Sequence, residues 1–198
     1  MAIKTEARRQ AIVAAAWRAF KESGFERTTM SEINERVGGS KGTLYSYFKS
    51  KEELFLAALD EAVADQADLA FDSLNQAGPL EERLAEFARR YMALRFSDDV
   101  VAIDRILVAE ADRPALGRRM QVEFITPKRE ALAEVMAREM TAGRLQRADA
   151  ARAAAHFFAM VEVDLLERRR QGDTSITPEE IEAAVQSGVA AFLRAYAP

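Results

Sequence analysis

The chain has 198 residues, of which 49% are hydrophobic and 30% are charged, and it contains no cysteine and one histidine. It is long enough for one large hydrophobic core or two small ones. A disulfide framework, a thiolate site and any metal site that needs two histidines are excluded, so we expect no metal and no cofactor. No run of about 18 apolar residues and no signal-peptide pattern appears, which predicts a cytoplasmic protein with no membrane partner.

The net charge of −4 is unevenly distributed along the chain. Residues 1–51 hold ten basic and five acidic residues, a net of +5, whereas residues 52–198 carry a net of −9. A basic head on an acidic body concentrates attraction for nucleic acid at one end of the chain. Chance clustering of charge is the alternative.

The first predicted helix covers residues 5–23. Its apolar stripe contains Ile12, Ala15, Ala16, Ala19 and Phe20, and Gly24 ends it. Trp17 falls at the edge of this stripe, where we expect it to be partly exposed.

The next stretch, from Thr28 to Leu54, predicts two short helices and the start of a third. Thr29 and Glu32 form one capping box and Ser50 and Glu53 another, each typical of a helix start. Gly38 and Gly39 provide a tight turn, after which Ser40 can cap a helix that turns Leu44 and Phe48 inward. Lys41, Gly42, Thr43, Tyr45 and Tyr47 are then left mostly outward. This pattern favours a helix-turn-helix, whose second helix enters the major groove of DNA, although an ordinary helical hairpin has the same periodicity.

The rest of the chain predicts further amphipathic helices and no strands, which gives an all-α fold. A helix from about residue 51 to 75 links head and body. The others are expected at residues 80–96, 100–112, 115–140 with a kink or division at Pro127, 149–170, and from Thr177 onward. Thr177, Pro178 and Glu180 combine a cap, an N1 proline and a capping box.

Residues 8–54 closely resemble the N-terminal DNA-binding region of TetR-family transcriptional regulators. The matching positions are Arg9, Ile12, Ala15, Ala16, Phe20, Gly24, Phe25, Thr28, Thr29, Ile33, Gly38, Ser40, Gly42, Thr43, Leu44, Tyr45, Tyr47, Phe48, Lys51, Glu52 and Leu54. The resemblance implies a three-helix DNA-binding domain at residues 1–52 and a larger helical domain at residues 53–198, for effector binding and dimerisation.

The same resemblance implies the residues that contact double-stranded DNA. Tyr45, Tyr47 and Lys51 would touch phosphates, Lys41, Gly42 and Thr43 would lie at base edges, and Thr29 would meet the DNA backbone. With the cap residue Ser40 added, the predicted set is Thr29, Ser40, Lys41, Gly42, Thr43, Tyr45, Tyr47 and Lys51.

Two residues depart from the family pattern. Asn34 stands where a small alanine is usual, and Gly39 stands where an apolar residue usually packs in the turn. A polar group in the helix contact and a freer backbone would together loosen the motif or shift its angle.

Residues 149–170 and 178–196 are apolar over more surface than one small domain buries, so we expect them to pair two copies as a four-helix bundle. Completion of the monomer core is the alternative. His156 fits an interface histidine better than a ligand.

The body also offers candidates for a small-molecule effector pocket, by resemblance to the family. They are Phe71, Phe87, Tyr91, Met92, Arg95, Glu110, Met120, Phe124, Phe158 and Glu162. Ordinary core packing is the alternative for any one of the apolar residues. Residues 103–134 loosely resemble the C-terminal domain of AefR-like members, which identifies no effector.

Together these features predict a homodimeric repressor that binds a palindromic operator and is released by a small molecule. An effector-independent DNA-binding dimer is the alternative. An enzyme is not expected, because no histidine partner or metal-ligand set accompanies the carboxylates of the body.

Overall fold

The computed structural model describes residues 5–110 and 114–198, and every regular element in this part of the chain is helical. The predicted all-α class is therefore confirmed. Contacts divide the chain into two compact units: unit 1 is Met1–Ala64 with Ala102–Met120, and unit 2 is Asp65–Val101 with Gln121–Pro198. The division into a DNA-binding domain at residues 1–52 and an effector-binding and dimerisation domain at residues 53–198 stays a prediction. Within the described ranges, no helix is both long and apolar enough to cross a bilayer.

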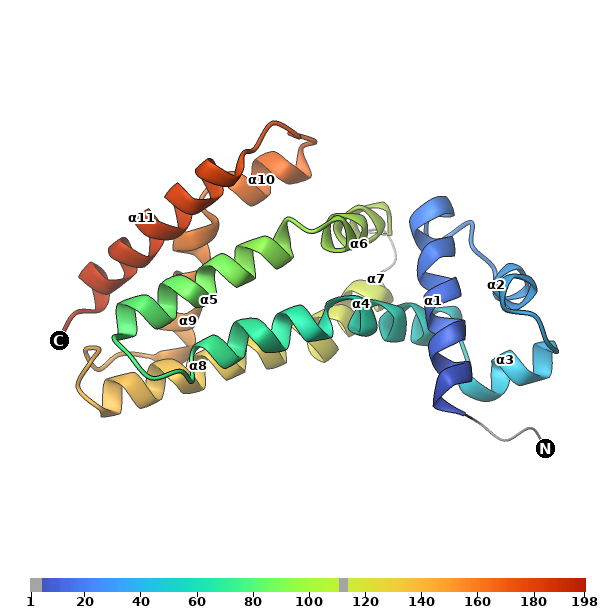
Figure 1. Cartoon of the computed structure of the whole chain (residues 1–198), viewed down its shortest axis with the longest axis horizontal. Helices are drawn as coiled ribbons and strands as arrows, with labels where there is room; N and C mark the ends of the chain where they lie inside the picture. Colours follow the sequence, from blue (N-terminus) through green and yellow to red (C-terminus); the bar gives the residue numbers. More distant parts are fainter. Residues whose placement is uncertain (1–4, 111–113) are drawn as a thin grey trace. The chain divides into compact units, whose positions relative to one another are not determined.

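The first three helices of unit 1 start at hydroxyl caps, and the first two of them end at glycines. It contains α1 (Glu6–Ser23), α2 (Met30–Val37), α3 (Lys41–Tyr47), the first part of α4 (Lys51–Ser73), most of α6 (Asp98–Ala109) and α7 (Pro114–Met120) (Figure 1). Thr29 and Ser40 cap α2 and α3 as predicted, each hydroxyl accepting from the N–H three residues on. Gly24 ends α1 with φ of 80° and Gly38 ends α2 with φ of 71°, a region that favours glycine.

The two predicted capping boxes of unit 1 are only half formed. Glu32 turns its carboxylate to Arg36 at 3.0 Å instead of to the N–H of Thr29. Glu53 accepts from the N–H of Lys49 at 2.8 Å, one residue before the expected partner. The caps thus rely on the Thr29 and Ser50 hydroxyls.

Aromatic rings form the core of unit 1. The Phe20 ring meets that of Phe55 edge-on, with centroids 5.3 Å apart, and Phe25 meets Phe55 in the same way at 5.4 Å. Trp17 joins them, 6.4 Å from Phe55, and is only 8% exposed. The prediction that Trp17 is partly exposed is wrong, because α4 covers the edge of the α1 stripe on which it lies.

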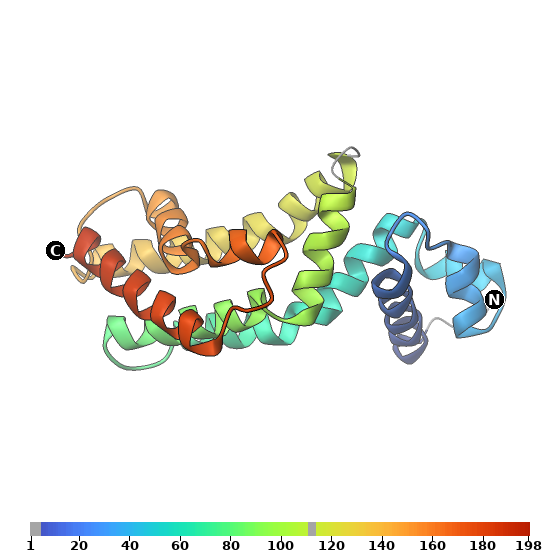
Figure 2. The same ribbon diagram turned by 90° about the horizontal axis from the view of Figure 1, so that it is seen from above.

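Unit 2 packs longer helices around one apolar core. It contains the rest of α4, α5 (Leu80–Arg95), a π-helical turn (Gln121–Ile125), α8 (Thr126–Thr141), α9 (Ala150–Glu162), α10 (Leu165–Arg170) and α11 (Pro178–Tyr196). α9 packs against α8 and α11, and α11 also packs against α5 (Figures 1 and 2). The core of these helices contains the fully buried rings of Phe87, Phe157 and Phe192.

Two predicted helices of the body are interrupted. The π-helical turn separates α7 from α8 just before Pro127, which has no N–H to give to a helical hydrogen bond, so the predicted division is confirmed. The continuous helix predicted at residues 149–170 is wrong: it breaks between α9 and α10 at Val163, whose φ is 44°. That conformation is unusual for a β-branched residue.

The remaining boundaries follow the sequence closely. α6 begins at Asp98, and its predicted end at residue 112 lies outside the described residues. The capping box of Thr177 and Glu180 is complete, with both hydrogen bonds present.

Candidate DNA-binding surface

α3 buries one face and leaves the other open. Leu44 and Phe48 are each 3% exposed, so they face inward as predicted, and Ile33 of the neighbouring α2 is fully buried. Lys41, Gly42 and Tyr45 are exposed, and half of the Tyr45 surface is accessible. A short helix thus presents polar groups and one ring on the side that the fold does not use.

The first turn of α3 is held by its cap. Ser40 Oγ accepts from the N–H of Thr43 at 3.1 Å and lies 2.9 Å from Thr43 Oγ1, so both hydroxyls have fixed positions. Between them, Gly42 has open surroundings: a Cβ built there would meet only Ser40 Oγ, at 3.8 Å. Packing against the described residues therefore does not require glycine at this position.

Hydrogen bonds stabilise the turn between α2 and α3 in place of the usual apolar contact. Asn34 Nδ2 donates to the carbonyl of Gly39 at 3.0 Å. Arg8, reaching from α1, donates to the carbonyl of Val37 at 3.3 Å and to that of Gly38. Gly39 has φ of 126°, and a Cβ on it would lie 2.8 Å from the Arg8 guanidinium. The two residues that depart from the family pattern, Asn34 and Gly39, thus bond to each other, and the polar group of Asn34 is satisfied.

Two residues predicted to touch phosphates, Tyr47 and Lys51, also form hydrogen bonds with the backbone of unit 1. Tyr47 Oη accepts from the N–H of Thr5, the cap of α1, at 2.9 Å. Lys51 Nζ donates to the carbonyls of Phe25 and Glu26 at 2.8 and 3.2 Å and lies 4.4 Å from the centre of the Phe25 ring. An ammonium has three N–H groups, so one stays available. Sequence reasoning missed these structural contacts.

Sequence reasoning also missed the role of Thr28. Its hydroxyl is fully buried, 2.7 Å from the Gly24 carbonyl and 3.2 Å from the Ala19 carbonyl. This fixes the loop that leads to Thr29, the cap of α2. A threonine directly before a capping threonine was the available signal.

In unit 2, several of the predicted effector residues come together. The centroid of the Phe87 ring lies 5.1 Å from that of Phe71, 6.1 Å from that of Tyr91 and 6.2 Å from that of Phe158. Tyr91 Oη donates to Glu162 Oε1. Burial first, and then the Glu162 charge, raise the pKa of Tyr91, whereas the nearby Arg95 opposes this shift. Tyr91 is therefore a neutral hydrogen-bond donor at physiological pH.

The other predicted effector residues lie elsewhere or are fully packed. Met92 is fully buried in the core of unit 2. Phe124 lies in the π-helical turn and is half-buried. Glu110 and Met120 belong to unit 1, where Glu110 lines a separate hollow.

The two segments predicted to pair in a dimer pack closely within one chain. A Cβ on Gly188 of α11 would lie 2.4 Å from the Met160 carbonyl oxygen and 2.7 Å from the Val161 Cα, so α9 and α11 meet backbone to backbone there. His156 Nδ1 lies 2.7 Å from Tyr196 Oη across the same contact. Among the described residues, no cluster of three or more histidine and carboxylate side chains is arranged to hold a metal ion.

The three-helix core, the capped turn and the open face of α3 define a helix-turn-helix protein. Comparison with known sequences places it more narrowly. The pattern of bacterial regulatory proteins of the tetR family matches residues 12–58, and that of the AefR-like transcriptional repressor C-terminal domain matches residues 82–198. The chain therefore belongs to the TetR family of DNA-binding transcriptional regulators, which are not enzymes.

Individual relatives agree with this family. The BetI regulator of Rhizobium meliloti (strain 1021) is 32% identical over 118 residues, which cover 59% of this chain and 58% of that protein. The match thus spans little more than half the length of that relative. A TetR-family regulator from Mesorhizobium loti MAFF303099 superimposes with a TM-score of 0.86 at 27% identity, covering 98% of this chain and 100% of its own. The flavonoid-responsive regulator FrrA gives 0.75 at 31% identity, covering 98% of this chain and 99% of its own.

Proposed function

We propose that the protein is a homodimeric repressor that reads a palindromic operator with α3 and releases it when a small molecule binds to unit 2. The single observation that carries the DNA-reading part is the open face of α3, where Gly42 sits between fixed hydroxyls without any packing reason for a glycine. A missing side chain lets a helix approach base edges closely, and the N-terminal residues of a recognition helix are those that reach them.

Each predicted DNA-contacting residue has a role in this proposal. Lys41 and Thr43 would meet base edges beside Gly42, and Tyr45, with an exposed ring and hydroxyl, would bond a phosphate. The free N–H of Lys51 and the hydroxyl of Tyr47 would add phosphate contacts, and Thr29 would meet the backbone from α2. Ser40 would act by holding Thr43.

The experiment is a gel shift with duplex DNA from immediately upstream of the gene for this protein, since such regulators often control themselves or a neighbour. A salt-sensitive shift that survives non-specific competitor supports the proposal. Tyr45→Ala should weaken it at least tenfold, while the exposed Glu35→Ala on α2 serves as a control. Equal affinity of Tyr45→Ala and the unaltered protein would reject this docking surface. If the upstream DNA does not shift, selection from randomised duplexes replaces it as the probe.

Dimerisation would use the outer faces of α9 and α11. Ala155 and Ala159 on α9 are exposed, and so are Ala183 and Ser187 on α11. Small side chains on two adjacent helices suit the close approach of a second pair in a four-helix bundle. Sedimentation should give a dimer, and Ala159→Glu should give a monomer that keeps its helical content. A monomer in the unaltered protein would refute this arrangement.

Effector binding would use the cluster of Phe71, Phe87, Tyr91 and Phe158, with the Tyr91–Glu162 pair as its polar group. Apolar rings with one or two placed polar groups are typical of small-molecule sites. α4 belongs to both units, so it offers a continuous element for coupling the cluster to α3. A thermal-shift screen with aromatic compounds, followed by release of bound DNA, tests this part.

One observation favours the alternative of an effector-independent dimer. Phe87 and Met92 are fully buried, so side chains already occupy part of the candidate site. If no compound raises the melting temperature and DNA binding is intact, the effector part of the proposal is rejected and the alternative is accepted.

A further inference from the structure

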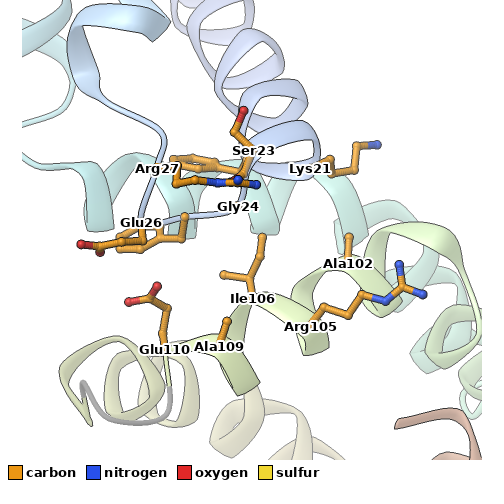
Figure 3. A pocket seen from close by; sticks show the side chains of 12 residues that line it. Lys21, Ser23, Gly24, Glu26, Arg27, Ala102, Arg105, Ile106, Ala109 and Glu110 are labelled. Carbon is orange, nitrogen blue, oxygen red and sulfur yellow. The ribbon is translucent and has the colours of Figure 1, made fainter. Parts of the chain in front are cut away.

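Unit 1 contains a hollow that the DNA-reading face does not use. Its volume is about 360 Å³, and it lies between the end of α1, the loop before α2 and one face of α6 (Figure 3). Phe20, Phe25 and Ile106 supply apolar surface, and the short side chains of Ala102 and Ala109 leave space along α6. A concave, mainly apolar site with a few polar groups is what small ligands require.

The charged groups around this hollow are not equally available. Arg105 is exposed and forms no ion pair within the described part of the chain. Arg27 donates one hydrogen bond, from Nε to the Ser23 carbonyl at 2.8 Å. Its two terminal nitrogens are available to bind a ligand. In contrast, Glu26 and Glu110 already have partners within the protein, and Lys21 lies over the Trp17 ring at 5.3 Å. In Figure 3 the two carboxylates lie at one end of the hollow and Arg105 lies at the other.

We propose that this hollow binds a small organic anion, a carboxylate on a short apolar body. Arg105 and Arg27 would take the carboxylate, because the planar guanidinium matches its two oxygens. Phe20, Phe25 and Ile106 would cover the apolar body. The site is separate from the aromatic cluster of unit 2.

The wall of the hollow is bonded to the elements that begin the helix-turn-helix. The loop carbonyls of Phe25 and Glu26 accept from Lys51 at the start of α4, and Thr28 holds the same loop just before the cap of α2. A ligand that binds to Arg27 therefore acts on the loop that positions α2. Coupling of the site to DNA affinity follows from this arrangement and rests on the proposed DNA-binding function, whereas ligand binding itself does not.

Calorimetric titration of the full chain with 3-phenylpropionate tests the site. The neutral 3-phenylpropanol and the cationic 3-phenylpropylamine have the same apolar body and serve as matched probes. We expect saturable binding of the carboxylate and at least tenfold weaker binding of the other two. Trp17, the only tryptophan in the chain, precedes Lys21 by one turn of α1, so its fluorescence should change with the same midpoint. No saturable binding of the carboxylate, or tighter binding of the amine, overturns the proposal.

Variants locate the bound anion. Arg105 lies on an exposed face of α6, and Arg105→Ala should weaken the binding of 3-phenylpropionate at least tenfold. Ala102→Leu should weaken this binding as much, because the larger side chain fills the hollow. Arg18→Ala removes an equally exposed arginine of α1 that does not line the hollow, and it should leave binding unchanged. Unchanged binding in both Arg105→Ala and Ala102→Leu would mean that the probe binds elsewhere, which rejects the site.

The coupling is tested separately by fluorescence anisotropy of the DNA found by gel shift, with and without saturating 3-phenylpropionate. We expect at least a threefold change in DNA affinity that Arg105→Ala abolishes. An unchanged DNA affinity with intact probe binding rejects the coupling alone. A chain that binds the probe but no DNA rejects the proposed function and leaves the anion site standing.

Discussion

α3 and α11 each carry a glycine inside the helix, and the surroundings of the two glycines are opposite. At Gly188 a Cβ would lie 2.4 Å from a backbone oxygen of α9, whereas at Gly42 it would meet one hydroxyl oxygen at 3.8 Å. A glycine inside a helix costs about 0.5–1 kcal/mol relative to alanine. Helix packing in unit 2 explains the glycine of α11. No contact among the described residues explains that of α3, which agrees with its proposed role at the DNA.

Polar groups differ between the same two regions. In α8 the carboxylate of Glu139 is 3% exposed and bonds Arg83 at 3.0 Å and also Arg144. In α3 the exposed Lys41 has no partner among the described residues. The body uses its buried charges to stabilise the fold, whereas the one charged side chain of α3 is exposed, as the proposed DNA-binding role requires.

The largest expected effect is that of Gly188→Ala on stability. The new methyl group meets backbone, which cannot rotate away, so we expect a loss of about 3 kcal/mol of unfolding free energy. Denaturant unfolding measures it. Gly117→Ala in α7, where a Cβ meets nothing within 4 Å, is the matched control and should gain about 0.5–1 kcal/mol. A harmless Gly188→Ala would show that α9 and α11 are not in backbone contact.

The second largest expected effect on stability is that of Glu139→Gln. We expect a loss of about 2 kcal/mol of unfolding free energy at neutral pH, because a buried acceptor for two arginines becomes a neutral amide. The hydrogen bond from Arg144, followed by that from Arg83, holds the pKa of Glu139 below its usual range. A carboxylate of lowered pKa stabilises the fold above its unfolded pKa of about 4.3, and this contribution is lost as the pH falls through the folded pKa.

The difference in unfolding free energy between Glu139→Gln and the unaltered chain should therefore be constant from about pH 6 to 8 and shrink below about pH 4. Glu134→Gln, on an exposed position of the same helix, should change stability by less than about 0.5 kcal/mol at any pH. A difference that persists undiminished in acid would mean that the ion pairs do not carry the effect.

Gly42→Ala should separate stability from DNA binding. The open surroundings predict a gain of about 0.5–1 kcal/mol in stability. The added methyl group should nevertheless weaken DNA binding about tenfold, or 1.4 kcal/mol, by holding α3 away from the groove. Gly117→Ala should give the same stabilisation with unaltered DNA affinity. If both variants bind DNA equally well, the contrast between the two helical glycines has no functional meaning.

Periodicity and caps were sufficient to predict most of the helices and the inward face of α3. Leu44 and Phe48 pack as their spacing indicated, and the capping box of Thr177 formed in full. These signals act within a few residues, so they can be predicted without knowing the tertiary fold. The family resemblance, carried by residues in fixed spacing, likewise identified the class of protein.

Features that depend on distant partners were not predictable. Trp17 is buried because Phe55 of another helix lies over it, and Lys51 bonds carbonyls more than twenty residues earlier in the sequence. The break at Val163 has no proline or glycine to mark it. Of the effector candidates, Glu110 and Met120 belong to a different compact unit from the aromatic cluster.

The smallest effect concerns the turn between α2 and α3. Asn34→Ala removes the hydrogen bond to Gly39, and because that bond is exposed we expect a loss of only about 0.5–1 kcal/mol in stability. The DNA affinity should fall about threefold, as the angle of α3 becomes less well defined. The salt dependence of binding distinguishes this from a lost contact. Asn34→Ala should keep the slope of log K against log salt, whereas Lys51→Ala, which removes a proposed phosphate contact, should reduce it by about 1.

Glu35→Ala, an exposed change on the same helix, controls for altered helix propensity and should leave both DNA affinity and slope unchanged. A reduced slope in Asn34→Ala would mean that this amide lies at the DNA and does not act through Gly39. An unchanged affinity would mean that Arg8, which bonds the carbonyls of Val37 and Gly38, is sufficient to hold the turn. In that case the recognition helix is oriented from α1, and Arg8→Ala should cause the loss that Asn34→Ala does not.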